Sequence, residues 1–367
     1  MKIAVVTVQR VTNYGALLQA FASKEILSKY GDVEIIDYDN RYLTSHMDLI
    51  RFKWSKRGIK MLVHDILNFK NRKRLLKNFK DFIRNHLNLT KSATREDLLG
   101  KEFQDYDYYV SGSDQIWNPS IVNADGKIDE VYFLAFAASN AKKVSLSSSM
   151  GGYTFTQEES KSIKRLLEAY SAISVRENEG ADYLNKLFPE KKIAKTLDPT
   201  LLLTESDWKK LADGKDPVIQ GGYILVYSVP RTALLRKAIT YFSKKFRMPV
   251  VAIDKMFNAM TDVDYSLRDM GPGEYISLFL NASFIITDSF HGTCFSVNFK
   301  KPFVCIPATK GANRQEGFLK ALGLMSRLVY EESEFDTITQ DLDFSGPAEK
   351  LSKLRAQSLG FLERAMS

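Results

Sequence analysis

Apolar residues along this chain form short β-branched runs that alternate with longer amphipathic stretches. The first 40 residues show the pattern. Lys2–Val8 (KIAVVTV) predicts a strand, the residues from Ala16 to Lys29 predict a helix that Gly31 ends, and VEIIDYD (33–39) predicts a second strand. A strand, a helix and a strand in this order form a βαβ unit, so we expect a parallel sheet.

The alternation recurs in two series, which predict two domains. The first series holds the strand-like runs YDYYVSG (106–112), KKVSLSSS (142–149), SAISVR (171–176) and KIAKTLD (192–198), with the helical stretch QEESKSIKRLLEAY (157–170). The second begins near Tyr223 with YILVYSV, a helix at 232–246, PVVAID, a helix at 274–282 and FIIT (284–287). A chain of 367 residues is longer than a typical single domain. We therefore predict Rossmann-like domains at 1–205 and 221–345. Between them we predict a linker at 206–220 that holds Gly214 and Pro217, and after them a terminal helix at 346–367.

Polar residues follow several of the predicted strands, where ligands bind in open α/β sheets. After FIIT comes the turn DSFHG (288–292), which contains one of only four histidines, then a short helix and the strand PFVCIP. The free N–H groups at that helix N-terminus favour an anion. The other polar or glycine residues at such positions are Asn13, Tyr14, Gly15, Ser113, Asp114, Gln115 and Arg176.

Each of these residues also has a purely structural interpretation. Asp114 and Asp288 are suited to cap helices, and Asn13 with Gly15 to shape a tight turn. His291 fits a buried histidine bonded to a backbone carbonyl, and Arg176 fits an ion pair with Glu177. The chain has no GxGxxG, Walker A, HExxH, GxSxG or CxxC motif, which weakens the dinucleotide, NTPase, zinc-protease and serine-hydrolase classes. The two cysteines, Cys294 and Cys305, suggest neither a metal cluster nor a disulfide framework, so a reducing cytoplasm is the simplest location.

Five motifs in this order and spacing resemble the polysaccharide pyruvyl transferase family: NYGALLQAF, SGSDQIWNP, ISVREN, LDPTLLL and TDSFHGTCFSVNFKKPF. The resemblance runs from the first strand to about Leu324. It implies an α/β, GT-B-like fold of two Rossmann-type domains whose parallel sheets face a central cleft. It also implies transfer of a pyruvyl group from phosphoenolpyruvate, without a metal or other cofactor, to a sugar of a bacterial surface polysaccharide or exopolysaccharide, which gives a cyclic ketal.

The same resemblance assigns the donor site to Arg176 and to an Arg-Leu-His-type motif at Ser289-Phe290-His291. This chain departs from the family pattern at Ser289, where characterised members have arginine. A hydroxyl in place of a guanidinium removes a bidentate anion contact, for which Arg314 or the helix N-terminus after His291 is the candidate replacement.

The mechanism we infer from these residues begins with the donor anion. Arg176 and the backbone N–H groups near Gly292 and Thr293 hold its phosphate and carboxylate. His291 protonates the enol methylene, because histidine exchanges protons near neutral pH, and Asp114 or Asp288 orients it or accepts a proton. The predicted catalytic residues are His291, Asp114 and Asp288, and the predicted substrate-binding residues are Arg176, Ser289, Gly292, Thr293, Asn13, Tyr14, Gly15, Ser113, Gln115 and Arg314.

The net charge of +8 belongs to one segment, because residues 51–84 carry seven lysines and five arginines against Asp65 and Asp81. Apolar residues recur there at spacings of three and four, which predicts a basic helical insertion at about 48–90. One interpretation is a solvated insertion, and another is peripheral contact with the inner membrane face, where lipid-linked oligosaccharide acceptors occur. No nucleic-acid motif accompanies the basic residues.

Two other functions remain open from the sequence. The first is a nucleotide-sugar glycosyltransferase of GT-B fold. The second is a non-catalytic glycan-binding relative, which the serine at position 289 suggests.

Overall fold

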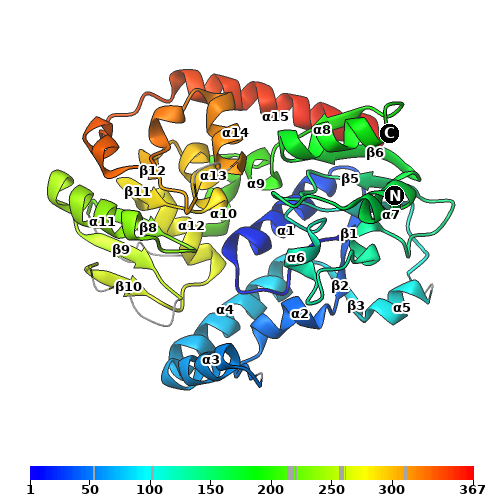
Figure 1. Ribbon diagram of the computed structural model, residues 1–367, viewed down its shortest axis with the longest axis horizontal. Helices are drawn as coiled ribbons and strands as arrows, with labels where there is room; N and C mark the ends of the chain where they lie inside the picture. The colour runs from blue at the N-terminus through cyan, green and yellow to red at the C-terminus, as the bar shows by residue number, and fades with distance from the viewer. Residues whose placement is uncertain are drawn as a thin grey trace. The chain divides into compact units, whose positions relative to one another are not determined.

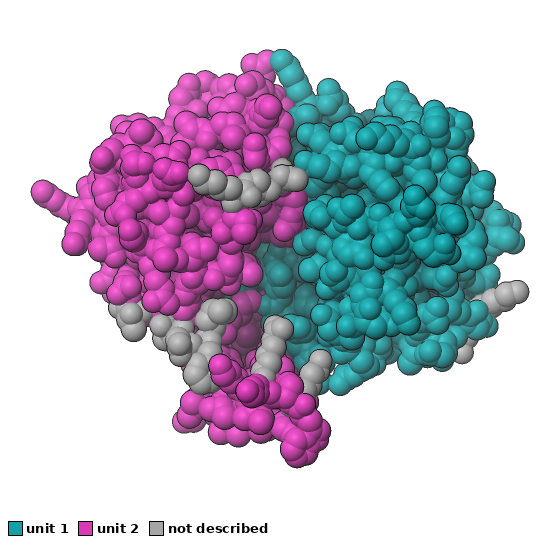
Figure 2. Space-filling model, viewed as in Figure 1, with its two compact units in different colours: residues 1–48, 81–202, 353–367 teal, residues 49–80, 203–352 magenta. Residues whose placement is uncertain are grey.

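The computed structural model describes residues 1–52, 54–100, 103–212, 219, 221–255, 260, 262–309 and 313–367. Gly214 and Pro217 of the predicted linker lie outside these residues. The chain divides into two compact units, which Figure 2 colours separately. Unit 1 comprises residues 1–48, 81–202 and 353–367, and unit 2 comprises residues 49–80 and 203–352. Part of the predicted basic insertion therefore belongs to unit 2, and the end of the chain belongs to unit 1.

Unit 1 is built on a seven-stranded sheet whose strands all pair in parallel (Figure 1). Its strand order is β3-β2-β1-β4-β5-β6-β7, so the chain starts in the middle and winds outward in both directions. The strands are β1 (Lys2–Val6), β2 (Asp32–Tyr38), β3 (Leu89–Ala93), β4 (Tyr108–Ser111), β5 (Lys142–Ser145), β6 (Tyr170–Val175) and β7 (Ile193–Lys195).

The helices of unit 1 cover this sheet and connect its strands. They are α1 (Tyr14–Leu27), α2 (Arg41–Thr44), α5 (Arg95–Leu99), α6 (Pro119–Val122), α7 (Gln157–Leu167), α8 (Asn178–Leu187) and α9 (Pro199–Leu202), with the short 3-10 helices η1 (Ser45–Met47) and η2 (Glu130–Phe133). Helix α7 begins at a capping box in which Thr156 and Glu159 satisfy each other's backbone N–H groups. The core between sheet and helices includes Ala4, Val6, Ile36, Trp117 and Val175.

Unit 2 repeats the design with five parallel strands in the order β10-β9-β8-β11-β12. The strands are β8 (Ile224–Tyr227), β9 (Val250–Ile253), β10 (Tyr265–Leu267), β11 (Phe284–Thr287) and β12 (Phe303–Cys305). Its helices are α3 (Lys56–Leu67), α10 (Glu205–Ala212), α11 (Ala233–Phe246), α12 (Pro272–Asn281), α13 (Phe290–Asn298) and α14 (Asn313–Leu322), with η3 (Met325–Arg327) and η4 (Glu332–Thr337). Its core includes Ile224, Val226, Phe242, Phe284 and Ile286.

Two long helices carry the chain from one unit into the other. Helix α4 (Phe69–His86) begins in unit 2 and ends in unit 1, and α15 (Ser345–Ala365) does the same near the C-terminus. None of the helices in the described ranges is long and apolar enough to cross a bilayer.

Candidate functional site

In unit 1, the predicted binding residue Arg176 lies directly after β6 and is buried among carboxylates. Its Nη1 lies 2.7 Å from Asp198 Oδ2, its Nε lies 3.0 Å from Glu177 Oε1 and its Nη2 lies 3.8 Å from Asp114 Oδ1. Burial lowers the pKa of the Arg176 guanidinium, but the three carboxylates outweigh it and raise that pKa above its ordinary value. With all four groups ionised, the cluster carries a net charge of −2. An anionic substrate that reaches Arg176 therefore competes with three carboxylates.

Neighbouring hydroxyl groups hold these carboxylates in place. Asp198 Oδ1 accepts hydrogen bonds from the backbone N–H (3.0 Å) and the hydroxyl (2.7 Å) of Thr200. Ser113 Oγ lies 3.2 Å from Asp198 Oδ2, and Ser149 Oγ donates to Glu177 at 2.6 Å. The structure thus brings together three motifs, SGSDQIWNP, ISVREN and LDPTLLL. Sequence reasoning missed the role of Asp198, although LDPT was among the motifs that it singled out.

Two further predicted residues shape the turn after β4. Asp114 has a left-handed backbone (φ 71°), and its carboxylate accepts a hydrogen bond from the N–H of Gln115 at 2.9 Å. The Gln115 side chain accepts a hydrogen bond from Asn118 at 3.2 Å. It also lies against Gly151 (φ 57°), where a Cβ would come within 2.1 Å of Gln115 Oε1. The positive φ favours glycine at position 151, and a larger residue there would also displace the end of the Gln115 side chain.

The predicted residues Asn13, Tyr14 and Gly15 form the start of α1. Asn13 is the N-cap, and its side chain accepts hydrogen bonds from the N–H groups of Gly15 (3.0 Å) and Ala16 (3.4 Å). Tyr14 and Gly15 are buried. The motif NYG therefore fixes where the first helix begins at this edge of the sheet.

In unit 2, Asp288 ties together the ends of two neighbouring strands. Its carboxylate follows β11 and accepts hydrogen bonds from Ser228 Oγ (2.5 Å) and from the N–H groups of Val229 (2.7 Å) and Arg231 (3.3 Å), all after β8. Burial raises the pKa of Asp288, and these hydrogen bonds only partly oppose the rise. The Arg231 side chain also pairs with Asp254, after β9, so one arginine connects three strand ends.

His291 and Ser289 lie beside Asp288 at the beginning of α13. Ser289 is the N-cap, and its hydroxyl accepts a long hydrogen bond (3.4 Å) from the N–H of Gly292. Its carbonyl accepts hydrogen bonds from the Thr293 N–H (2.9 Å) and hydroxyl (3.0 Å). The two N–H groups that were predicted to hold the donor, those of Gly292 and Thr293, therefore bond within the helix. His291 is 8% exposed, and its ring centroid lies 5.5 Å from that of Phe290.

A close approach between strand and helix holds His291 near the end of β11. A Cβ built on Gly292 would come 2.2 Å from Thr287 Oγ1 and 3.1 Å from the ring of Tyr227. Only glycine lets α13 pack this closely onto the sheet.

The predicted residue Arg314 lies near this helix. Its guanidinium carbon stands 5.7 Å from the centroid of the Phe290 ring, at cation–π distance. The neighbouring Gln315 donates a hydrogen bond to the carbonyl of Asp288 at 3.1 Å. Unit 2 therefore brings together four of the predicted residues: Asp288, Ser289, His291 and Arg314.

Sequence reasoning missed Lys255, which follows β9 and is directly next to Asp254. Its ammonium lies 5.8 Å from the centroid of the Phe79 ring, and burial lowers the pKa of Lys255 to about 7. A lysine in this state exchanges protons near neutral pH. Its position at a strand end was the only signal in the sequence.

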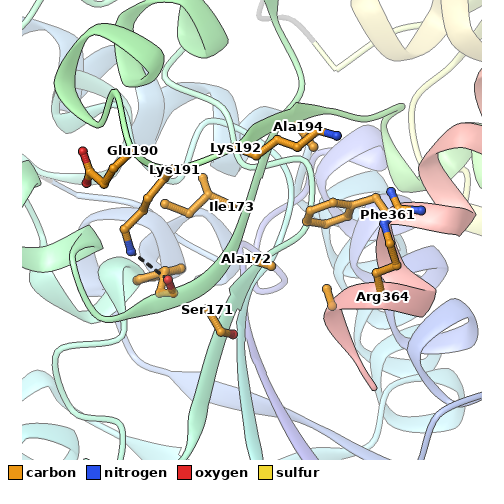
Figure 3. Close-up of a pocket in the computed structure, with 11 residues that line it drawn as sticks. Ser171, Ala172, Ile173, Glu190, Lys191, Lys192, Ala194, Phe361 and Arg364 are labelled. Carbon is orange, nitrogen blue, oxygen red and sulfur yellow. Dashed lines mark hydrogen bonds between the residues drawn. The ribbon is translucent and has the colours of Figure 1, made fainter.

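A cavity of about 440 Å³ in unit 1 lies away from these residues, near the beginning of β6 and β7. Figure 3 shows Lys191, Lys192 and Arg364 around it, with Phe361 of α15 on one side. Arg176 follows the opposite end of β6, so this cavity is not part of the predicted site. Among the described residues, no three His, Cys, Asp or Glu side chains are grouped so that they could hold a metal ion.

Comparison with known protein families identifies the class of this protein. The family model described as polysaccharide pyruvyl transferase matches residues 13–308, from the cap of α1 to just beyond β12. The chain therefore belongs to the polysaccharide pyruvyl transferase family, and so to transferases that act on polysaccharides. Comparison with curated proteins gives no match.

Solved structures with the same fold confirm the predicted fold class. UDP-N-acetylglucosamine 2-epimerase from Rickettsia bellii aligns with 100% of this chain and 96% of its own, at 10% identity and a TM-score of 0.54. UDP-GlcNAc 2-epimerase from Methanocaldococcus jannaschii aligns with 96% of this chain and 91% of its own, at 13% identity and a TM-score of 0.50. At these identities the likeness concerns the fold alone. Together with the two parallel sheets, it confirms the α/β, GT-B-like class of two Rossmann-like domains.

Proposed function

We propose that this protein transfers the pyruvyl group of phosphoenolpyruvate to two hydroxyl groups of one sugar in a bacterial surface polysaccharide or exopolysaccharide. The observation that carries the proposal is the family match over residues 13–308, which includes every predicted site residue except Arg314. The acceptor that we propose is a glycan or a lipid-linked oligosaccharide, met in the cytoplasm or at the inner membrane face.

The donor carries several negative charges, and the proposal assigns cations to them. Ser289 is neutral where the family pattern has arginine, so another cation has to replace that guanidinium. Arg314 is the candidate in the same unit, because its guanidinium carbon lies 5.7 Å from the centroid of the Phe290 ring, and Phe290 directly precedes His291. Arg176 is the second cation that the resemblance assigns to the donor. Since three carboxylates surround it, we assign the larger share of the binding free energy to Arg314.

The proposed reaction has two steps. In the first, an acid protonates the methylene carbon of phosphoenolpyruvate, and a sugar hydroxyl attacks the adjacent carbon and loses its proton. In the second, another hydroxyl of the same sugar attacks that carbon, phosphate leaves with the second proton, and the cyclic ketal closes. In this proposal His291 supplies the first proton, because it is the histidine at the strand end that the family motif marks.

Asp288 holds the loop after β8 in place for this reaction. It accepts three hydrogen bonds from that loop, so we assign it an orienting role rather than proton transfer. Lys255, whose pKa is about 7, is the additional group in unit 2 that can accept a proton from an acceptor hydroxyl.

A transfer assay tests the proposal. The purified chain is incubated with phosphoenolpyruvate and a panel of sugar glycosides, and products are read by mass spectrometry together with phosphate release. The expected product has the mass of the glycoside plus pyruvic acid minus one water, and His291→Ala loses it. A glycosylated product formed from a nucleotide sugar in parallel reactions, with none from phosphoenolpyruvate, would contradict the proposal.

A further inference from the structure

Large apolar side chains are exposed along one short stretch of unit 2. Trp54 is 91% exposed and Leu67 is 73% exposed. The other exposed large apolar residues in this stretch are Ile50, Phe52, Ile59, Val63, Ile66 and Phe69. Single exposed apolar residues are ordinary, but a concentration of this kind marks an interaction surface. We call the described residues from Ile50 to Phe69, without Lys53 and the side chain of Arg57, the α3 surface.

Helix α3 is exposed on its apolar side, the reverse of an ordinary surface helix. Ile59, Val63 and Ile66 are spaced by four and three residues, so they lie on one face, and all three are exposed. Among the α3 residues whose side chains are described, the buried ones are Gly58 and Asp65, which lie roughly 100–120° around the helix axis from this stripe. The apolar stripe of α3 therefore points to solvent.

A buried ion-pair network fixes the segment before α3 against the helices. Asp65 accepts hydrogen bonds from the Arg51 N–H (2.9 Å), Nε (2.9 Å) and Nη2 (2.6 Å). Arg72 of α4 lies 3.5 Å from the same carboxylate and donates to the carbonyl of Leu49 at 2.8 Å. Burial raises the pKa of Asp65, but its hydrogen bonds with Arg51 and His64 outweigh this and lower it to about 2. The carboxylate thus anchors Arg51, directly before Phe52, whose ring centroid lies 4.8 Å from that of Trp54 in an edge-to-face arrangement.

The α3 surface is also basic. Lys56 and Lys60 are exposed on α3 and lie on the same half of the helix as Ile59 and Val63. Helix α4, beyond the α3 surface, adds the exposed cations Lys70, Lys73, Arg74, Lys77, Lys80 and Arg84, of which Arg74 lies 3.4 Å from Asp269. Of the two acidic residues in segment 51–84, Asp65 is buried with Arg51, and Asp81 pairs with Arg84 at 2.8 Å. An apolar stripe with a tryptophan, bordered by lysines, complements the interface of an anionic bilayer.

We propose that the α3 surface binds anionic lipid membranes, with Trp54 and the stripe of Ile59, Val63 and Ile66 inserted at headgroup depth. The lysines contact the lipid phosphates, and the Asp65 network anchors the chain at Arg51, just before the aromatic pair. Membrane binding by the α3 surface requires neither the donor nor the acceptor of the proposed reaction, so it is measured with vesicles alone.

Trp54 is a built-in reporter for this test. The chain has three tryptophans, and the other two, Trp117 and Trp208, are fully buried. The full-length protein is mixed with phosphatidylcholine vesicles with and without phosphatidylglycerol. We expect a blue shift of tryptophan emission and protection from acrylamide only with the anionic vesicles, and loss of that shift in Trp54→Phe. Unchanged emission with both kinds of vesicle would overturn the proposal.

A vesicle sedimentation assay adds a matched pair of variants. Ile66→Glu with Leu67→Glu places two charges on the α3 surface and is expected to weaken binding at least about tenfold. Ile121→Glu, at an exposed apolar position of unit 1, leaves binding unchanged. Thermal unfolding checks that each variant is folded. Equal binding by the double variant would overturn the proposal. So would a dimer in analytical ultracentrifugation that the double variant dissociates, since the α3 surface would then bind a second copy of the chain.

Discussion

Arg176 Nη1 and Asp198 Oδ2 lie 2.7 Å apart in the interior of unit 1. Arg176 ends the run that contains β6, and Asp198 follows β7, so the pair joins the ends of neighbouring strands. Glu177 and Asp114 complete the surroundings of the guanidinium. One cation compensates three acidic groups here, which makes its removal more costly than the removal of any one carboxylate.

Arg176→Met is therefore expected to destabilise the protein more than Asp198→Asn. The first change leaves three carboxylates without their cation and should lower the free energy of unfolding by about 3–5 kcal/mol. The second leaves Arg176 with two carboxylates and should cost about 1–3 kcal/mol. Urea unfolding of both variants measures the difference. Equal losses in the free energy of unfolding would contradict the idea that Arg176 compensates the charge of the three carboxylates. A stable Arg176→Met protein that no longer binds phosphoenolpyruvate would instead indicate that Arg176 contacts the donor directly.

The sequence predicted most of the fold, because most of the sheet in both units is built from buried β-branched runs. Every strand-like run that it marked is a strand in the structure, from β1 to β12. It missed β3 (LTKSA) and β10 (YSL), both at sheet edges. Each mixes polar with apolar residues, and only Ala93 among them is buried, so they show no apolar run to detect.

The candidate site was predicted less completely than the fold. Asp288 and His291 could be identified because they directly follow a predicted strand. Ion pairs between residues that are far apart in the sequence leave no local pattern, so they could not be predicted. Asp198 lies 22 residues from Arg176, and Asp254 lies 23 residues from Arg231, so only the folded sheet brings each pair together. The exposure of the apolar face of α3 could not be predicted either. The spacing of its apolar residues indicates an amphipathic helix but does not show which face is buried.

Gly292→Ala should disturb the placement of His291. The added methyl would meet Thr287 Oγ1, so α13 has to move away from β11. We expect a loss of about 1–3 kcal/mol in the free energy of unfolding and a lower transfer rate. Gly346→Ala is the matched control, since open space surrounds that position in α15, and it should be neutral or slightly stabilising. Indistinguishable effects of the two changes would contradict the close packing at Gly292.

The lowered pKa of Lys255 predicts that the free energy of unfolding rises with pH. Its pKa is lowered from 10.5 to about 7, so between these values the unfolded chain holds a proton that the folded chain has lost. The free energy of unfolding of the wild type, relative to Lys255→Met, should therefore rise from pH 7 to pH 9, at up to about 1.4 kcal/mol per pH unit. Chemical denaturation at several pH values measures this difference. Lys244→Met, at an exposed position of α11, is the control, and a difference that stays flat for Lys255→Met would contradict the lowered pKa.

Arg314 is expected to matter for donor binding but not for folding. It is half-buried beside Phe290, and Arg314→Gln removes a charge-assisted contact with the donor in the proposed complex. We expect the dissociation constant for phosphoenolpyruvate to rise about tenfold to a hundredfold, with little change in thermal stability. Arg236→Gln, at an exposed position of α11, is the matched control.

Calorimetric titration most directly tests whether this protein uses phosphoenolpyruvate as its donor. Phosphoenolpyruvate is titrated into the wild-type protein, Arg314→Gln and Arg236→Gln. We expect saturable binding to the wild type and to Arg236→Gln, and much weaker binding to Arg314→Gln. No binding of phosphoenolpyruvate to the folded wild type, with saturable binding of UDP or a UDP-sugar in its place, would contradict this expectation.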